Sequence, residues 1–573
     1  MLIINTAGHI DHGKSSIIKA LNGFDGDSTQ EEIRRAITID LSFSNLEDVS
    51  FIDVPGHENL LKTMVLGVQS EYAMLVVDIN EGLKEQSKEH ILILKILDVK
   101  NIILVLNKID LCKNIDEKKA EILSSIDFKP LQTFLVSAKT NEGIDDLKHF
   151  ILNLKRPQYI EDDFVRIFID RVFNVKGQGN VATGILRNGA IKENLNLVNE
   201  NNENVQIKQI QVQHKNTDCA YALSRVAFTY KGKLEKNQIL AKKGYLRKTK
   251  TIYASINTKL KHLEKVLFCC GSKIINATYY EFGEYARFEL EQECAFCFDD
   301  AYIVLKNSRF AAGGKILLSV VEPLKKQKLL ELLNLLNKKD FYEVFKFLSK
   351  VHIFGFGLFC SKQRFNLDLN KALNIAQELN LLFDKDKACL YSHEALEKTS
   401  KKIKQLFDKN KYSMQSANSL SKSLEIDSFL CDIALKNMQD LECKNKLYFK
   451  KGLDYEELNQ NIKDILFSKL DLLTPNAPYN IYDELNLDRK QGDLLMKELC
   501  ARNLIIRLAH NYFLSKRALD EFVQKLTPFL KKGLDVQELK NNFNLSRKYA
   551  IAILDYLSTQ KNIKNIDNKR FLI

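Results

Sequence analysis

The chain of 573 residues has no tryptophan, only seven prolines and no long uninterrupted hydrophobic run. A membrane-spanning helix needs about 20 consecutive apolar residues. The first residues, MLIINTAGH, lack the basic segment and apolar core of a signal peptide. The eleven cysteines are an odd number spread over a long chain, which does not fit a disulfide framework. These absences predict an unprocessed cytoplasmic protein with no membrane partner.

One close pair of cysteines, Cys294-x-x-Cys297, lies in the strand-like stretch ARFELEQECAFCF. No second pair follows at the spacing of a zinc ribbon. We interpret the two residues as reduced structural thiols and assign no metal to them.

The net charge of +12 is concentrated in the C-terminal part of the chain. Residues 325–573 hold about 43 Lys and Arg against about 31 Asp and Glu, which leaves residues 1–324 near neutrality. Solvated helix faces can carry many lysines, but an asymmetry this complete favours a polyanion as partner.

The length predicts about four domains, and Pro157 and Pro323 stand where the sequence pattern changes. Up to residue 156, apolar strand runs alternate with helical stretches, as in a doubly wound parallel sheet. After that, short alternating strands with glycine-bearing turns predict two small β-barrels. The predicted domains are 1–156, 157–245 and 246–324.

From residue 325 the helical period returns with an internal repeat. A helix is followed by an apolar pair, a polar turn and a second apolar pair, as in AIAILDYLSTQKNIKNIDNKRFLI. The unit recurs about four times, at intervals of roughly 60 residues. A helix that ends in a two-stranded wing with a polar tip is typical of a winged helix, and a plain helical array with hairpins is the alternative. The predicted modules are about 325–398, 399–452, 453–517 and 518–573.

Residues 8–15 read GHIDHGKS, between the apolar strand LIINTA and the helix SSIIKALNG. This is a phosphate-binding loop in the context that it requires, with backbone N–H groups and a helix N-terminus facing the phosphates. Lys14 is expected to reach the β and γ groups, and Ser15 to hold magnesium. Asp53 ends the strand VSFIDV, where a magnesium-linked carboxylate belongs, and Gly56 can bring its N–H to the γ-phosphate.

Two further motifs predict the base pocket. In Asn107-Lys108-Ile109-Asp110, the Asp110 carboxylate can accept hydrogen bonds from N1–H and the exocyclic amine of guanine, which adenine cannot offer. Ser137-Ala138-Lys139 completes the pocket after the strand TFLV. The four motifs in this order predict GTP/GDP and Mg²⁺ as ligands. The predicted nucleotide contacts are Gly8, Asp11, His12, Gly13, Lys14, Ser15, Ser16, Gly56, Asn107, Lys108, Asp110, Ser137, Ala138 and Lys139.

The predicted fold is therefore multidomain: an α/β P-loop GTPase domain, two β-barrels, and a mostly α C-terminal array of tandem winged helices.

The motifs GHIDHGKS, DVPGH, NKID and SAK resemble the translational GTPases of the elongation factor Tu group, in which a GTPase domain precedes two β-barrels. The resemblance implies that His57 is the catalytic residue, which orients the attacking water, and that the ribosome stimulates GTP hydrolysis. It also implies that Thr38, with Ser15 and Asp53, holds the metal. Ala36 departs from the glycine common two residues before that threonine, and Asp11 matches an aspartate that some members use for a monovalent cation.

The rest of the chain looks like the bacterial selenocysteine-specific elongation factors. The similarity lies in the short first switch, in the barrel sequences FIDRVFNVKGQGNVATGILRNGAI and IQVQHKNTDCAYALSRVAF, and in the C-terminal LSRKYAIAILDYL. It implies a monomeric factor that binds selenocysteinyl-tRNA and delivers it to the ribosome at UGA codons. The last winged helices would bind a hairpin in the selenoprotein mRNA.

This resemblance gives a chemical meaning to three residues of the first barrel. A selenol is acidic enough to be an anion at neutral pH, whereas a cysteine thiol, with a pKa of about 8.5, and a serine hydroxyl are mostly neutral. Asp170, Arg171 and Arg225 match the family's selenocysteine pocket, with Asp170 orienting an arginine. An ordinary strand-surface ion pair is the alternative.

The predicted RNA contacts are Arg547, Lys548, Tyr549 and Arg570, which supply cations for phosphates and one ring for a base. Ser546 is the predicted N-cap of a helix, so that Arg547 and Lys548 would lie at its exposed start. Tyr549 fits a core position equally well.

Three other functions share part of this pattern. A GTP-regulated transcription factor would also use winged helices, but it has no need of a barrel pair that carries tRNA. The GTPase subunit that activates sulfate adenylylation has the first three domains without the basic arm. Another translational GTPase with an unrelated extension would have an ordinary amino-acid pocket.

Overall fold

The computed structural model describes residues 2–23, 42–53, 71–156, 164–177, 179–212, 215–307, 309–320, 323–410 and 412–573. The chain folds into two compact units. One unit comprises Met1–Leu348, Gly357–Leu379 and Lys385–Cys389, and the other comprises Ser349–Phe356, Asn380–Asp384 and Leu390–Ile573. Within the described ranges, every helix is too short or too polar to cross a membrane.

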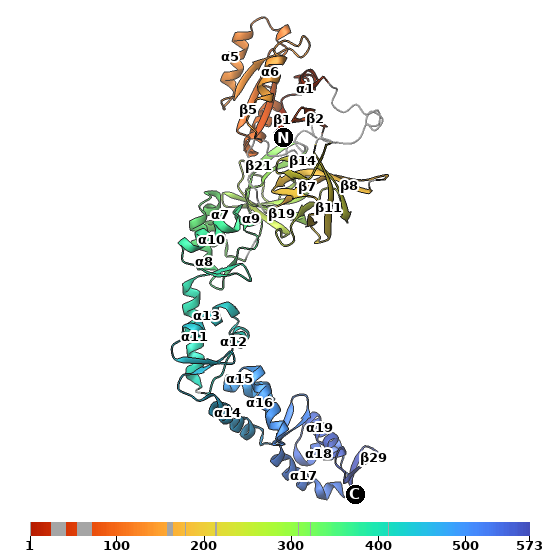
Figure 1. Cartoon of the computed structure of the whole chain (residues 1–573), viewed down its shortest axis with the longest axis vertical. Coiled ribbons are helices and arrows are strands. Elements are labelled where there is room, and N and C mark those ends of the chain that lie inside the picture. The colour runs from red at the N-terminus through yellow and green to blue at the C-terminus, as the bar shows by residue number, and fades with distance from the viewer. Residues whose placement is uncertain are drawn as a thin grey trace. The chain divides into compact units, whose positions relative to one another are not determined.

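The first unit begins with a six-stranded sheet in the order β2-β3-β1-β4-β5-β6, which is parallel except for the edge strand β2. Figure 1 shows the elements of this domain in red and orange. Helices α1 and α6 pack on one face and α4 and α5 on the other, and each face has its own apolar core. The central strands read as continuous apolar runs because both faces are buried. The elements are β1 (Leu2–Ala7), α1 (Lys14–Asn22), β2 (Ser42–Leu46), β3 (Val49–Asp53), β4 (Tyr72–Asp78), α4 (Glu85–Ile96), β5 (Asn101–Asn107), η1 (Ile109–Leu111), α5 (Ile115–Ser125), β6 (Gln132–Leu135) and α6 (Ile144–Leu152).

Two antiparallel β domains follow in the same unit. The first is a seven-stranded sheet in the order β10-β15-β7-β8-β14-β11-β12, which returns on itself because β10 also pairs with β11. Its strands are β7 (Arg166–Val175), β8 (Gly179–Asn188), β10 (Asn196–Val198), β11 (Asn204–Val212), β12 (Lys215–Thr217), β14 (Ser224–Gly232) and β15 (Ile239–Ala241), with a small pair of β9 (Ala190–Lys192) and β13 (Cys219–Tyr221).

The second β domain is a closed barrel in the order β16-β19-β18-β17-β20-β21, filled by one aromatic-rich core. We call these two domains barrel II and barrel III. The strands of barrel III are β16 (Thr249–Ala254), β17 (Lys265–Cys270), β18 (Lys273–Phe282), β19 (Tyr285–Cys294), β20 (Ala301–Lys306) and β21 (Arg309–Leu318).

The first helical module after barrel III is divided between the two units. It contains α7 (Lys326–Asn337), α8 (Phe341–Val351), β22 (Phe356–Gly357), α9 (Ser361–Phe365), α10 (Leu369–Glu378), β23 (Leu382–Asp384) and β24 (Cys389–Tyr391).

The second unit then repeats three helices and a β-hairpin three times. The first repeat has α11 (His393–Lys409), α12 (Ala417–Leu424), α13 (Ser428–Asn437), β25 (Leu441–Lys444) and β26 (Leu447–Lys450). The second has α14 (Tyr455–Leu470), α15 (Pro478–Leu485), α16 (Arg489–Ala501), β27 (Ile505–Ala509) and β28 (Tyr512–Ser515). The third has α17 (Lys516–Leu530), α18 (Val536–Phe543), α19 (Arg547–Ser558), β29 (Ile563–Ile566) and β30 (Lys569–Leu572). The predicted fold class is confirmed.

Candidate functional site

The phosphate-binding loop lies between β1 and α1, and two of its glycines have backbone angles that only glycine adopts easily. Gly8 has a φ of 131° and Gly13 a φ of 89°. A Cβ atom at Gly8 would lie 2.1 Å from the carbonyl oxygen of Val76, and one at Gly13 would lie 2.3 Å from Nδ2 of Asn107. The loop can therefore follow its tight curve only without side chains at these positions.

The helix that follows the loop presents its N-terminus to the site. Lys14 begins α1, and Ser15 and Ser16 follow in its first turn. The residue before the helix has no side chain, so no side chain caps the helix, and its first N–H groups can bind an anion. The ammonium group of Lys14 lies over the loop, where it donates to the carbonyl oxygens of Gly8 (3.2 Å) and His9 (2.8 Å).

The base motifs come from the ends of β5 and β6, and one buried side chain joins them to the phosphate loop. Asn107 donates from Nδ2 to the carbonyl oxygen of His12 at 3.0 Å, and its Oδ1 accepts from the backbone N–H of Ala138 at 3.1 Å. The hydroxyl of Ser137 donates to Oδ1 of Asp110 at 2.7 Å. The parallel sheet brings these motifs together because the carboxyl ends of neighbouring strands share one edge.

The ammonium group of Lys108 is held in place by an acidic residue that the sequence did not single out. It lies 2.8 Å from Oδ2 of Asp78, at the end of the neighbouring strand β4. Burial by itself would raise the pKa of Asp78, but hydrogen bonds from Lys108 and Asn80 outweigh it and lower the pKa. This aspartate therefore stays ionised and keeps Lys108 over the base side of the site.

A cavity of about 580 Å³ lies between the loop and the base motifs. Among the predicted contacts that the structure describes, Gly8 and His12 are not in its lining. His12 is buried, and burial first, then the neighbouring His9, lowers its pKa. The lining residues are Ile10, Asp11, Gly13, Lys14, Ser15, Ser16, Asn107, Lys108, Asp110, Leu111, Ser137, Ala138 and Lys139. The volume and polar lining fit one nucleotide.

Several predicted residues lie outside the part of the chain that the structure describes. These are Thr38, Gly56 and His57, together with Ala36. Asp53 ends β3 as expected, but the description covers only its backbone. The metal and catalytic roles of these residues stay predictions.

The structure also brings two unpredicted residues, Gln86 and His90 of α4, into contact with the phosphate loop. The sequence could have indicated them, because they are two polar residues, four positions apart, on the buried face of an amphipathic helix.

The three predicted selenocysteine-pocket residues lie on β7 and β14 of barrel II, the two strands that flank β8. The register between β7 and β8 shifts between Ile169 and Arg171, so that Asp170 is the extra residue of a β-bulge. One carboxylate oxygen of Asp170 accepts from the hydroxyl of Thr183, and the other accepts from Nε and Nη2 of Arg225, both at 3.3 Å. Arg171 is partly buried and is the next residue of β7. The structure therefore joins Asp170 to Arg225, and it shows Thr183 as a partner that the sequence did not reveal.

At the other end of the chain, the start of α19 is as predicted. Ser546 is the N-cap residue, and its hydroxyl accepts from the N–H of Tyr549, so this prediction is confirmed. Arg547 and Lys548 are exposed at the first turn. The ring of Tyr549 lies 4.4 Å from that of Tyr512 and packs against the apolar core, which favours the core position over a free stacking surface.

Arg570 lies on β30, in the wing of the last module, and its side chain contacts the same module. Its side chain is 12% exposed, and its guanidinium donates to the hydroxyl of Ser558 and the carbonyl oxygen of Asn568 and lies 3.7 Å from Asp555. These contacts hold the wing against α19 and engage the planar guanidinium on three sides.

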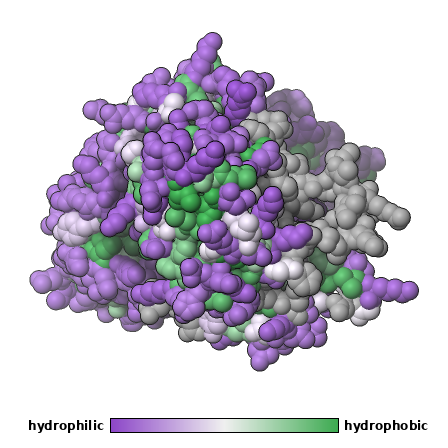
Figure 2. Space-filling model, turned by 90° about the horizontal axis from the view of Figure 1, so that it is seen from above, coloured by the Kyte–Doolittle hydropathy of each residue, from purple (hydrophilic) through white to green (hydrophobic). Residues whose placement is uncertain are grey.

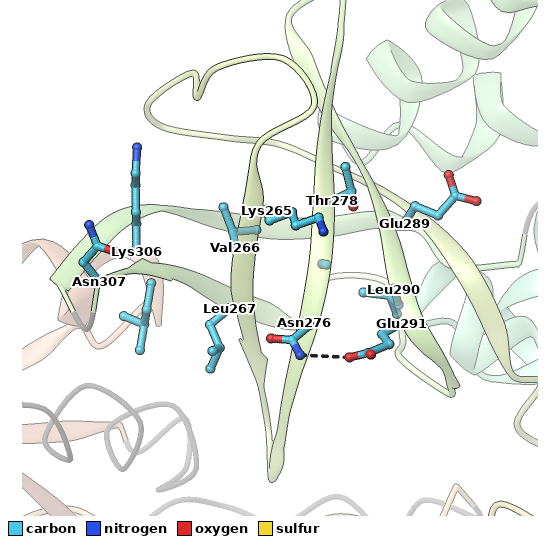
Figure 3. Close-up of a pocket in the computed structure, with 12 residues that line it drawn as sticks. Lys265, Val266, Leu267, Asn276, Thr278, Glu289, Leu290, Glu291, Lys306 and Asn307 are labelled. Atoms are coloured by element: carbon cyan, nitrogen blue, oxygen red, sulfur yellow. Dashed lines mark hydrogen bonds between the residues drawn. The ribbon is translucent and has the colours of Figure 1, made fainter.

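A second hollow of about 680 Å³ lies on the outer face of barrel III (Figure 3). Side chains from β17, β18 and β19 line it, and Asn276 donates to Glu291 at 2.8 Å. It holds both lysines and glutamates and has no helix N-terminus, so it lacks the features of a phosphate site. The surface in Figure 2 is likewise mostly hydrophilic, with small hydrophobic patches.

Cys294 and Cys297 are free and buried. Burial raises the pKa of Cys294 to about 11 and that of Cys297 to about 12. Both thiols are therefore protonated and unreactive at neutral pH.

Comparisons with known proteins find family models that match the two ends of the chain and relatives that are similar to it. The family model of the elongation factor Tu GTP-binding domain matches residues 1–157, and that of the winged helix of elongation factor SelB matches residues 530–572. The selenocysteine-specific elongation factor of Desulfomicrobium baculatum is 27% identical, with 99% of each chain covered. That of Haemophilus influenzae is 36% identical over 41% of this chain and 39% of its own.

A crystal structure of bacterial selenocysteine-specific elongation factor EF-Sec has a TM-score of 0.70 and 24% identity, and it covers 100% of this chain and 99% of its own. That likeness establishes the fold over the whole length. With three of its four GTP-binding motifs lining one cavity, the chain is a GTPase that uses GTP and GDP with Mg²⁺, and over its whole length it is similar to the selenocysteine-specific elongation factors.

Proposed function

We propose that the chain binds selenocysteinyl-tRNA and delivers it to the ribosome at UGA codons, while its C-terminal winged helices bind a hairpin in the mRNA. It acts as a cytoplasmic monomer. The domains 1–156, 157–245, 246–324 and 325–573 divide this work into GTP hydrolysis, binding of the aminoacyl end, binding of the tRNA body and binding of the hairpin.

In the nucleotide site, Lys14 would neutralise the β- and γ-phosphates, and the backbone of the loop would cradle them. Ser15, Thr38 and Asp53 would hold Mg²⁺, which stabilises the charge that develops on the phosphates. Asp110 would read guanine. His57 would orient the attacking water, since phosphoryl transfer is catalysed mainly by positioning and electrostatics.

The observation that carries the cargo assignment is the contact between Asp170 and Arg225. Their side chains are 14% and 27% exposed, so the guanidinium is oriented by a carboxylate yet remains accessible to a ligand. Arg171 follows Asp170 on β7, and a cationic pocket favours a selenolate over a neutral thiol or hydroxyl.

The hairpin site is the exposed start of α19. Arg547 and Lys548 lie at a capped helix start, where cations can contact the phosphates of an RNA duplex. Tyr549 and Arg570 would support this surface from within the module.

The test of cargo selection is protection of the aminoacyl ester bond from hydrolysis, with GTP and the full chain, for selenocysteine and serine on the same selenocysteine tRNA. Protection of the selenocysteinyl form alone supports the proposal. Equal protection of both forms contradicts the selenol pocket, and protection of neither contradicts tRNA binding and favours a winged-helix regulator.

The pocket residues are tested with Arg171→Ala and Arg225→Ala. Each should reduce protection of the selenocysteinyl ester at least tenfold while GTP affinity stays the same, because the loss of a charge-assisted contact is worth roughly 1.5–3 kcal/mol. Lys231→Ala, on the exposed end of the same strand as Arg225, is the matched control. Equal losses for tRNA and GTP would refute the assignment.

A further inference from the structure

Helix α4 carries the buried polar side chains of Gln86 and His90 one helical turn apart. Gln86 is 7% exposed and His90 is 1% exposed, in a helix whose other buried residues are mostly apolar. Because residues four apart lie on the same face of a helix, both side chains point in the same direction. Buried polar groups need partners, and the partners of this pair identify its role.

Both side chains accept hydrogen bonds from the backbone of the phosphate loop. The N–H of Gly8 donates to Nδ1 of His90 at 2.9 Å, and the N–H of Ile10 donates to Oε1 of Gln86 at 3.1 Å. An imidazole that accepts at Nδ1 is neutral and carries its proton on Nε2. The N–H groups of Gly8 and Ile10 in the phosphate loop are thus both bonded to α4, a helix that belongs to none of the GTP-binding motifs.

The other end of α4 is fixed by apolar packing. Ile93 and Ile96 belong to the same core as Ile303 of barrel III. A Cβ atom at Gly313 of β21 would lie 2.8 Å from Cδ1 of Ile96, so the absence of that side chain makes room for the helix. The helix therefore cannot shift without losing buried contacts, and it presents Gln86 and His90 at a fixed position.

We propose that Gln86 and His90 are positioning residues of the nucleotide site, which hold the phosphate loop in its binding curve and thereby slow the release of GDP and GTP. Gly8 packs closely against β4, since a Cβ atom there would lie 2.1 Å from the carbonyl oxygen of Val76. Without an acceptor on α4, the buried N–H of Gly8 would have no partner, and the loop would gain by turning it toward water. That movement would release the phosphates.

The test measures dissociation of a fluorescent GDP from the full chain after rapid mixing with excess GDP. His90→Leu removes the acceptor and keeps the bulk, whereas His90→Asn keeps an acceptor near the position of Nδ1. We expect dissociation about five- to tenfold faster for His90→Leu and within about twofold of the parent for His90→Asn, as the loss of one buried hydrogen bond predicts. Lys88→Ala, on the exposed side of the same helix, is the control and should leave the rate unchanged.

Gln86→Leu is a second variant, which removes the less buried hydrogen bond, from the N–H of Ile10. It should also accelerate GDP dissociation several-fold, and it tests the proposal independently if His90→Leu folds poorly. A merely structural role would lower the melting temperature of both His90 variants without separating their dissociation rates. The proposal is overturned if His90→Asn releases GDP as fast as His90→Leu, or if His90→Leu and Gln86→Leu both retain the parent rate.

Discussion

Replacing Asn107 by alanine should weaken nucleotide binding strongly, because this one side chain joins the phosphate loop to the base motifs. Asn107 is 3% exposed and makes two hydrogen bonds, at 3.0 Å to the carbonyl oxygen of His12 and at 3.1 Å from the N–H of Ala138. Asn107→Ala leaves both of these backbone groups unpaired in the interior. Each unpaired group costs roughly 1–3 kcal/mol.

If about 2–4 kcal/mol of this cost appears in binding, the dissociation constant for GDP rises by roughly 30- to 1,000-fold. The assay is equilibrium titration of the full chain with fluorescent GDP in the presence of Mg²⁺. Asn101→Ala, at the opposite end of the same strand, is the matched control and should bind normally. Affinity of Asn107→Ala within twofold of the control would refute the role of this side chain as the link between the two halves of the site.

Three further predictions concern the loop, the barrels and the arm. Gly8→Ala should abolish tight GDP binding, since its Cβ would lie 2.1 Å from a carbonyl oxygen, and normal binding in titration would contradict this. Asp300→Ala should lower the free energy of unfolding by about 3–5 kcal/mol in denaturant titration, because it leaves the buried Arg166 unpaired, and a loss below about 1 kcal/mol would show that the cation finds another partner. Burial by itself would raise the pKa of Asp300, but the charge of Arg166 outweighs burial and lowers the pKa below its ordinary value of 3.8. The ion pair therefore stabilises the fold fully at pH values above 3.8, and this stabilisation is lost as the pH falls through the lowered pKa. Arg547→Ala should weaken hairpin binding and reduce the slope of log affinity against log salt by about 1, and an unchanged slope would place the RNA surface elsewhere.

The GTP site was predictable because its chemistry is carried by short contiguous motifs. Each motif follows a strand of the sheet, and a parallel sheet places the carboxyl ends of its strands at one edge. Eleven of the thirteen residues that line the cavity belong to the predicted nucleotide contacts. Local rules also sufficed for the start of α19, where Ser546 caps the helix as its sequence position indicates.

Residues that act through distant partners were not predictable in this way. Arg570 looked like a free cation at a wing tip, but its side chain folds back onto Ser558 and Asp555. Tyr549 packs against Tyr512, which belongs to the preceding repeat. In both cases the partner lies outside the local window that sets periodicity and capping.

The sequence by itself determined the nucleotide, the order of the domains and the repeat of the arm, since motif chemistry, hydrophobic period and turn residues are properties of neighbouring positions. Only the tertiary structure decided which side chains complete the sites. Asp170 meets Arg225 across 55 positions, and Gly8 meets His90 across 82. These contacts depend on strand register, a β-bulge and the packing of a helix on a sheet, which are set by the burial of the whole domain rather than by any local pattern.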